Sequence, residues 1–179
     1  MRKKKMLWLV VILVLAVAAW KIGLVYALAV AAALALALTA LYTVKWLIAS
    51  RGWRRLQEEY SRYGYPALLE GLSRRYPQAP DAFSFVVLGD TRNKVRIAAE
   101  VYRRAAGESP AMIFHTGDIV RHGGPQEFLN NHVRLLSITD PAPMFCVPGN
   151  HDRGVRRDFG AFKTLYGADR FAFDFGGCR

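Results

Sequence analysis

The chain has 179 residues, 53% of them hydrophobic, and its net charge of +11 is spread unevenly. Residues 1–55 hold nine Lys or Arg and no acidic residue, whereas residues 56–179 hold 16 basic and 14 acidic residues. The excess of positive charge belongs to the amino-terminal region, so it gives no indication of a nucleic-acid partner. The two cysteines have neither metal-ligand spacing nor a disulfide framework, and we expect a buried thiol at Cys146 and an incidental one at Cys178.

Residues 1–48 predict a membrane segment. A run of 14 apolar residues at 7–20 follows a basic cluster at positions 2–5, and an apolar run of 23 residues follows at 22–44. As a helix the second run is about 34 Å long at ~1.5 Å per residue, which matches a hydrocarbon core of ~30 Å. We therefore expect a two-helix hairpin, residues 6–20 and 22–46, that turns near residues 20–23.

The basic residues also predict an orientation. Four lie before the first arm and four lie at or just after the second, with only Lys21 between them. Because basic residues mark the cytoplasmic side, we expect the following domain on the cytoplasmic face of an inner or cytoplasmic membrane. The alternative is a single span with an extracytoplasmic domain.

Residues 49–80 predict a juxtamembrane connector. Its apolar residues have the spacing of two short amphipathic helices, broken at Gly64 and Pro66. Its tryptophan and arginines suit a membrane interface, but a linker that packs on the domain fits the pattern equally well.

Residues 81–179 predict an α/β domain. Short apolar runs at 83–88, 112–115 and 144–147 are typical of buried parallel strands, and residues 94–106 and 126–136 have helical periodicity between them. Residues 159–166 predict a further helix and residues 171–175 a further strand. Because strands alternate with helices, we expect parallel or mixed β-sheet layers with flanking helices.

A glycine and a polar side chain follow each predicted strand. The three sequences are Gly89-Asp90-Thr91-Arg92, Gly117-Asp118-Ile119-Val120 and Gly149-Asn150-His151-Asp152. Because parallel strands end at one edge of a sheet, we expect these loops to gather around one site. A Gly-Asp pair arises by chance about once in such a chain, but a Gly-Asn-His-Asp tetrad only on the order of once in a thousand chains.

Each residue also has a structural alternative. Asp90 and Asp118 could cap the helices that follow them, and residues 149–152 could form an ordinary turn. Among the remaining histidines we expect His115 and His132 to pack in the core, and His122 to lie on a solvated loop.

The three motifs resemble those of the calcineurin-like metallophosphoesterases, over about 95 residues. That family's pattern begins with Asp-x-His, continues with Gly-Asp-x-x-Asp/Asn and Gly-Asn-His-Asp/Glu, and closes with a lone His and Gly-His-x-His. The resemblance implies two divalent metal ions, Mn, Fe or Zn, with Asp90 on the first, Asp118 bridging both and Asn150 on the second. It also implies that His151 acts on the phosphate as a catalytic residue and that Asp152 orients its ring.

The chain departs from this pattern at two places. Arg92 stands where the family has its first His, and an arginine cannot ligate a metal. Arg92 and Arg153 are instead candidates for contacting substrate phosphate. The lone His and Gly-His-x-His are absent from the sequence, so we expect it to hold only the amino-terminal part of such a domain.

The sequence therefore predicts a membrane-anchored, metal-dependent phosphoesterase that acts on phosphoric esters or pyrophosphates, with a lipid-linked phosphate as an attractive substrate. The alternative is a catalytically inactive remnant that serves as a membrane-attached interaction module. A dinucleotide-binding fold is disfavoured because no G-x-G-x-x-G follows the first predicted strand.

Overall fold

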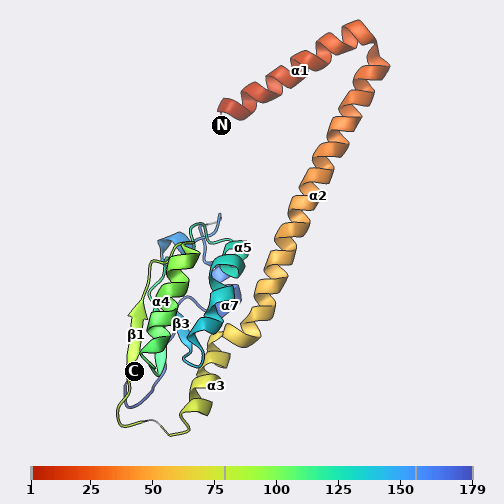
Figure 1. Cartoon of the computed structure of the whole chain (residues 1–179). Helices are drawn as coiled ribbons and strands as arrows, with labels where there is room; N and C mark the ends of the chain where they lie inside the picture. The colour runs from red at the N-terminus through yellow and green to blue at the C-terminus, as the bar shows by residue number, and fades with distance from the viewer. Residues whose placement is uncertain (1, 79, 156, 179) are drawn as a thin grey trace. The chain divides into compact units, whose positions relative to one another are not determined.

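The computed structural model describes residues 2–78, 80–155 and 157–178. The chain divides into two compact units, Met1–Ile48 and Ala49–Arg179. Helix α1 (Arg2–Ile22) and the first part of helix α2 (Leu24–Tyr63) make up the first unit (Figure 1). The two helices are separated at Gly23, whose φ of +84° lies in the left-handed region that glycine adopts without strain.

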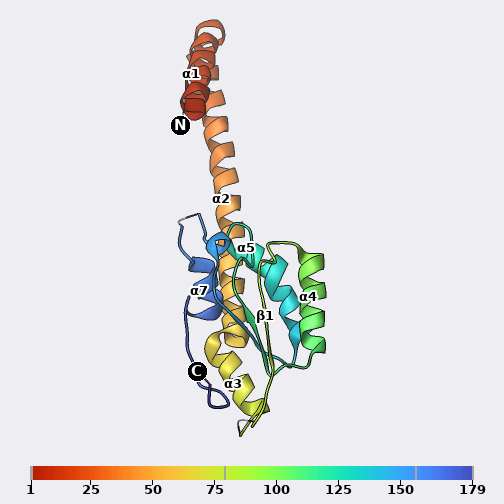
Figure 2. The ribbon, with the colours of Figure 1, turned by 90° about the vertical axis from the view of Figure 1, so that its left-hand side faces the viewer.

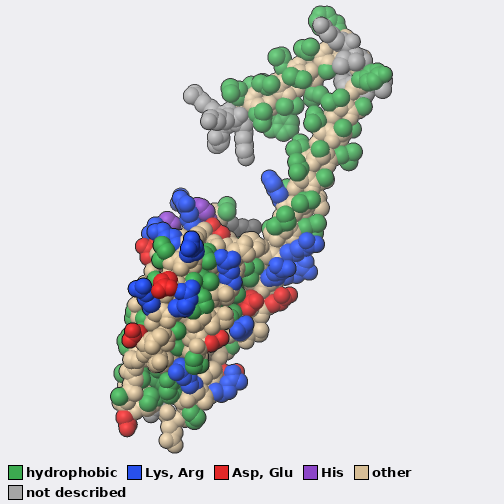
Figure 3. Space-filling view, viewed as in Figure 1, with side chains coloured by type: hydrophobic (Ala, Val, Ile, Leu, Met, Phe, Trp, Pro, Cys, Tyr) green, Lys and Arg blue, Asp and Glu red, His purple; other side chains and the backbone are tan. Residues whose placement is uncertain are grey.

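The first unit exposes apolar side chains along both helices (Figure 3). By length and composition, one helix among the described residues is apolar enough to cross a membrane. This helix is a candidate membrane span or signal sequence. The side chains at positions 2–5 and 21, on which the predicted orientation partly depends, lie outside the part of the chain that the structure describes.

The connector differs from its prediction. The first of the two expected short helices does not exist separately, because α2 continues through it to Tyr63 and ends only at Gly64. No proline and only one glycine interrupt residues 49–63, so nothing in the sequence ends the helix earlier. Helix α3 (Tyr65–Arg75) then begins with Pro66 in its first turn, where a proline is tolerated.

The connector packs on the domain. Leu56 of α2 is fully buried, and Leu68 and Leu72 of α3 are buried in the same hydrophobic core as the strands. Of the two placements that the sequence allowed for the connector, the structure shows the one against the domain.

Three parallel strands form the sheet of the second unit, in the order β1-β2-β3. They are β1 (Phe85–Leu88), β2 (Met112–His115) and β3 (Met144–Cys146), and the register pairs Leu88 with His115 and His115 with Cys146. The prediction of an α/β domain with parallel strands is confirmed. The strands end level with one another, which brings the loops after them to one edge of the sheet.

Helices connect the strands. Helix α4 (Val95–Gly107) joins β1 to β2 and buries Ala98, Tyr102 and Ala105. The helix expected at 126–136 is present as a continuous helical run, which a π-helical stretch divides: α5 (Pro125–Phe128), the π-helical η1 (Leu129–Val133) and α6 (Arg134–Leu136), followed by the 3-10 turn η2 (Ser137–Thr139). The wider π turn changes which side chains face the core, a detail that apolar periodicity does not encode.

The two faces of the sheet are covered differently. The helical face packs against α4, with the ring of His115 edge-on to that of Tyr102. On the other face, the Phe114 and Phe145 rings contact Phe173 of the carboxyl-terminal segment. Figure 2 shows α4 and this segment on opposite sides of β1.

The prediction of a strand at residues 171–175 is wrong. Within the described residues this segment forms one isolated bridge, Phe175 with Cys178, and does not pair with the sheet. The rings of Phe171 and Phe173 pack on Phe145 of β3, and the Phe175 ring packs on Tyr76 and Phe83. Ring contacts rather than backbone hydrogen bonds with the sheet therefore hold the segment in place. The alternation that predicts a strand here reports one-sided packing.

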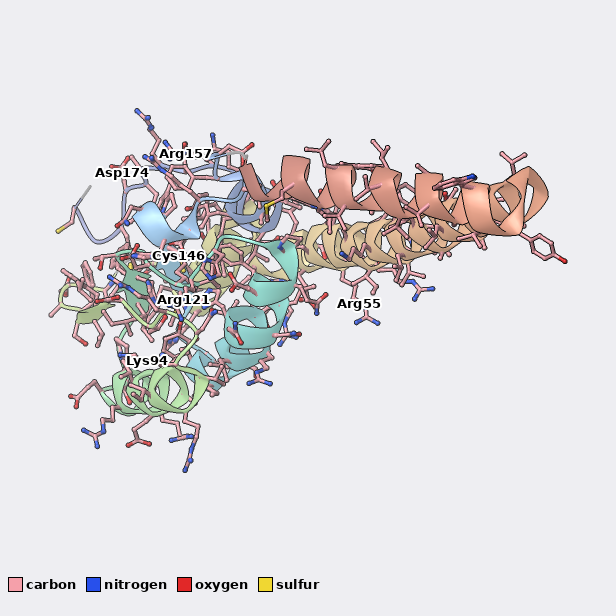
Figure 4. All side chains as sticks on the ribbon, turned by 90° about the horizontal axis from the view of Figure 1, so that it is seen from above. Arg55, Lys94, Arg121, Cys146, Arg157 and Asp174 are labelled. Atoms are coloured by element: carbon pink, nitrogen blue, oxygen red, sulfur yellow. The ribbon has the colours of Figure 1, made fainter. Side chains whose placement is uncertain are left out.

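The core holds a short chain of polar side chains. His132 Nδ1 lies 3.0 Å from the Tyr102 hydroxyl, and its Nε2 lies 2.5 Å from the hydroxyl of Tyr166, in helix α7 (Gly160–Tyr166). The Cys146 thiol donates to the same Tyr166 oxygen over 3.1 Å. Cys146 lies inside the domain, whereas Arg55 points out from α2 (Figure 4). The predictions that His132 and Cys146 are buried are confirmed.

Candidate functional site

The loops after the three strands meet at the carboxyl edge of the sheet. The Asp90 amide donates to the Gly117 carbonyl and the Arg92 amide to the Asp118 carbonyl, each over 3.0 Å. Together the loops line a shallow, open cavity of about 470 Å³, formed by Gly89, Asp90, Thr116, Gly117, Asp118, Gly149 and Asn150. The structure therefore brings Asp90, Asp118 and Asn150 to one cavity, as the motif spacing predicts.

Glycine allows the second and third loops to approach this closely. A Cβ on Gly149 would lie 2.2 Å from Asp118 Oδ1, and a Cβ on Gly117, whose φ is +102°, would lie 2.3 Å from the Gly149 amide nitrogen. Neither position has room for a side chain. The two glycines thus fix the spacing between the Asp118 and Asn150 loops.

The site also concentrates unusual backbone conformations. Asp90, Arg92, Asn93 and Asp118 have φ values of 58°, 33°, 55° and 54°, in the left-handed region. Such conformations in residues other than glycine cost of order 1–3 kcal/mol each and persist only where the surroundings impose them. The two loops are therefore held in a conformation that points their carboxylates toward a common place.

Asp118 is at the centre of the cluster, with a side chain that is 16% exposed. Its Oδ1 accepts the backbone N–H of His151 over 3.0 Å, which joins the second motif to the third. Its Oδ2 accepts from Arg92 Nη2 over 3.1 Å. Arg92 also pairs with the more exposed Asp90, Nε to Oδ1, over 2.5 Å, so one guanidinium links both carboxylates.

Asp152 has different partners from those expected. Its carboxylate is fully buried; Oδ1 accepts the backbone N–H groups of Ile119 and Val120 over 2.9 Å each, and Oδ2 accepts that of Gly149 over 2.8 Å. Burial raises the pKa of Asp152, and the three backbone donors oppose that rise. The expected role of orienting the His151 ring is not what these hydrogen bonds do; they tie the second loop to the third.

The His151 ring has a partner from the second loop. Its Nδ1 lies 3.4 Å from the backbone carbonyl oxygen of Arg121, and the ring lines a second cavity of about 470 Å³ beside the first. That cavity is lined by Arg121, His122, Asn150, His151, Arg153, Gly154 and Val155. The Arg153 guanidinium lies over the Phe159 ring, 5.3 Å from its centroid. The second cavity gathers cationic and imidazole groups, which suit an anion.

Sequence reasoning missed two residues that support the loops. The Thr91 hydroxyl is buried, 3.2 Å from His115 Nε2 and 3.4 Å from the Ile119 carbonyl that it donates to. Glu127 accepts from the Asn93 side chain over 2.9 Å and from the His122 amide over 2.8 Å. The position of Thr91 between two motif residues could have identified it from the sequence. Nothing in the sequence identifies Glu127 beyond its place in a helical turn.

His115 is packed, as predicted, and it supports the same loops. Its Nδ1 accepts the Gly117 N–H over 3.2 Å, so the ring proton sits on Nε2 and is directed to Thr91. Burial lowers the pKa of His115 from 6.5 to about 4, although Asp118 and Asp90 act in the opposite direction. The imidazole is therefore neutral near pH 7, and it holds the turn that carries Asp118.

The oxygen donors of the first cavity fit one metal ion better than two. Asp90, Asp118 and Asn150 offer two carboxylates and one amide oxygen, a set that suits a single hard divalent cation. Among the residues that the structure describes, no group of three or more His, Cys, Asp or Glu side chains is placed to hold a metal. The described donors alone do not fit a dinuclear centre.

Comparison with known proteins agrees with this arrangement of loops. The family model for calcineurin-like phosphoesterases matches residues 83–177. The chain is 29% identical over 114 residues to the uncharacterized protein YvnB of Bacillus subtilis (strain 168), across 56% of this chain and 9% of YvnB. The chain thus matches only a small part of that relative's length, and no solved structure matches it. The match runs from just before β1 past all three motif loops, and on that basis the chain belongs to the calcineurin-like phosphoesterase family.

Proposed function

We propose that the protein is a membrane-anchored phosphoesterase that hydrolyses a phosphoric ester or pyrophosphate at the edge of its sheet. One observation carries the proposal: Asp90, Asp118 and Asn150 line a single cavity, and the backbone N–H of His151 donates a hydrogen bond to the Asp118 carboxylate. Family membership supports the reaction class. It does not identify the substrate class, which we propose from the membrane attachment.

In this proposal the two neighbouring cavities have different tasks. The first offers oxygen donors for a divalent cation, which in this family supplies an activated water and charge neutralisation. The second presents His151 and Arg153 beside Arg121, where the anionic oxygens of a phosphate ester find hydrogen-bond donors. His151 is the proposed proton donor to the leaving group, because it belongs to the loop that lines both cavities.

The membrane assignment is part of the proposal. The apolar helix supports attachment, and the excess of basic residues at the ends of the amino-terminal segment favours a cytoplasmic domain. Attachment would give the site access to phosphate esters carried on lipids. An amphipathic ester such as a lipid-linked phosphate is therefore the substrate class that we propose.

The test is hydrolysis of a generic aryl phosphodiester by the full chain in detergent micelles with millimolar Mn²⁺. Asp118→Asn keeps the size of the side chain but removes its charge, and we expect its rate to fall at least about a hundredfold. Asp81→Asn is the matched control, because Asp81 is exposed and precedes β1. Equal rates for the wild type and Asp118→Asn would remove the support for catalysis.

A second function is favoured by a specific observation, the ion pairs that Arg92 makes with both carboxylates. If the guanidinium stays there, the domain would bind phosphate groups without hydrolysing them and would act as a membrane-attached interaction module. The same preparation distinguishes the two functions. A binding module would retain inorganic phosphate in equilibrium dialysis, lose it in the Arg153→Gln variant, and show no turnover.

A further inference from the structure

Arg92 occupies the place between the two carboxylates of the first cavity. Its Nε lies 2.5 Å from Asp90 Oδ1 and its Nη2 lies 3.1 Å from Asp118 Oδ2. The backbone strengthens the link, since the Arg92 amide donates to the Asp118 carbonyl over 3.0 Å. One residue therefore joins the first loop to the second by its side chain and by its main chain.

The local conformation holds Arg92 in this position. Asp90 and Arg92 both have left-handed φ values, so the turn folds back and brings the guanidinium over the carboxylate two residues earlier. The Asp118 carboxylate, with its side chain only 16% exposed, cannot turn freely, because its other oxygen accepts the His151 amide. The contact with Asp118 is thus better fixed than an ordinary surface ion pair.

A guanidinium in this place changes what the carboxylates can bind. It carries a positive charge and has no lone pair to offer a metal. A divalent ion bound to the same oxygens would lie within a few ångströms of that charge, and this repulsion weakens binding by at least about tenfold, even at the dielectric constant of water. The two carboxylates are already paired with a positive charge of the chain itself, the Arg92 guanidinium.

We infer that Arg92 is the counter-ion of this site: it holds the Asp90 and Asp118 loops together without a metal and competes with a divalent ion for their oxygens. The inference goes beyond the proposed function because it says which positive charge pairs with the two carboxylates. It is tested by metal binding, without any substrate. Loss of hydrolysis would leave it standing, and its own failure would leave the assignment of the reaction open.

The test is Mn²⁺ binding to the full chain in detergent micelles, followed by calorimetry and by the electron paramagnetic resonance of free Mn²⁺. We expect Arg92→Gln to bind Mn²⁺ at least about tenfold more tightly than the wild type, because the repelling charge is gone and two carboxylates are released. Arg96→Gln is the matched control: it removes an exposed arginine four positions away, on α4. It should bind Mn²⁺ as the wild type does.

Two results would overturn the inference. One is equal Mn²⁺ affinity in Arg92→Gln and Arg96→Gln. The other needs no variant: the thermal midpoint of the wild type should be the same in EDTA and in micromolar Mn²⁺, a concentration well below that used for hydrolysis, and a rise of several degrees there would show that a tightly bound metal and not Arg92 holds the loops. This second measurement decides the matter even if Arg92→Gln does not fold.

Discussion

His115 and His132 are the buried histidines of the described residues, and both are kept neutral by burial. Burial lowers the pKa of His115 from 6.5 to about 4 and that of His132 well below 6.5. As the pH falls below about 6.5, the unfolded chain binds a proton at each histidine and the native chain does not. The unfolded state therefore binds more protons in this range, and the free energy of unfolding falls with falling pH.

This sign gives a prediction for acid stability. Between about pH 6.5 and pH 4 the free energy of unfolding should fall by up to about 1.4 kcal/mol per pH unit for each histidine. His132→Gln keeps polar atoms for both tyrosines but does not titrate, so its pH slope should be shallower than that of the wild type. Urea unfolding followed by near-ultraviolet circular dichroism measures the slope.

The control for this experiment is His122→Gln, because His122 is exposed on the loop after β2. The slope of His132→Gln should be shallower than that of His122→Gln. Asp152, whose pKa is raised by burial, is present in all three proteins and cancels in the comparison. An unchanged slope in His132→Gln would show that His132 does not contribute to the loss of stability in acid.

At the scale of elements, α3 is the link between the connector and the sheet. The Tyr65 hydroxyl donates a short hydrogen bond to the Cys146 carbonyl at the end of β3. Its ring packs between those of Tyr166 and Phe171, with centroids 5.7 and 4.1 Å away. One side chain thus joins α3, α7, the carboxyl-terminal segment and the strand that leads into the Asn150 loop.

Tyr65→Phe should destabilise the domain by about 1–3 kcal/mol, because it leaves a buried carbonyl without its donor while keeping the ring. Tyr76→Phe is the comparison: Tyr76 also packs on a phenylalanine ring, but it is only partly buried. We expect it to change stability by no more than about 0.5 kcal/mol. Urea unfolding of both variants measures the difference. Equal losses of unfolding free energy would mean that the Tyr65 hydroxyl does not help to hold α3 on the sheet.

The elements that the sequence predicted well are those with local signals. The three strands are short apolar runs bounded by turn residues, and their order places the glycine-led motifs at one edge. The continuation of α2 also had a local signal, since no helix breaker ends it before Gly64, but the π turn at residues 129–133 depends on tertiary packing, which periodicity does not report. Residues 171–175 alternate because they pack on one side, a pattern that strands share.

The site shows the same division. The gathering of Asp90, Asp118 and Asn150 followed from chain order and strand geometry. The hydrogen bonds of Asp152 did not, because the residue beside it, His151, suggested a different partner. Nor did the double ion pair of Arg92 follow, since it depends on the left-handed turn that folds the guanidinium back.

At the scale of the whole molecule, the chain combines an apolar amino-terminal unit with a compact α/β unit. The proposed orientation is testable with reporters fused after Arg55, in cells that have a periplasm. If both helices cross the membrane and return, a reporter that works only in the cytoplasm should be active and a periplasm-only reporter silent. Activity of the periplasmic reporter would contradict the hairpin and favour a single span.

The claim that connects all three scales is that the loops after β2 and β3 act as one phosphoesterase site. The direct measurement is a double-mutant cycle on aryl phosphodiester hydrolysis with Asp118→Asn, His151→Gln and the double variant, in the full chain with saturating Mn²⁺. Residues that act as a unit are not additive, so the double variant should lose little more than the worse single variant. Losses that multiply, or single variants as fast as the wild type, would contradict the account.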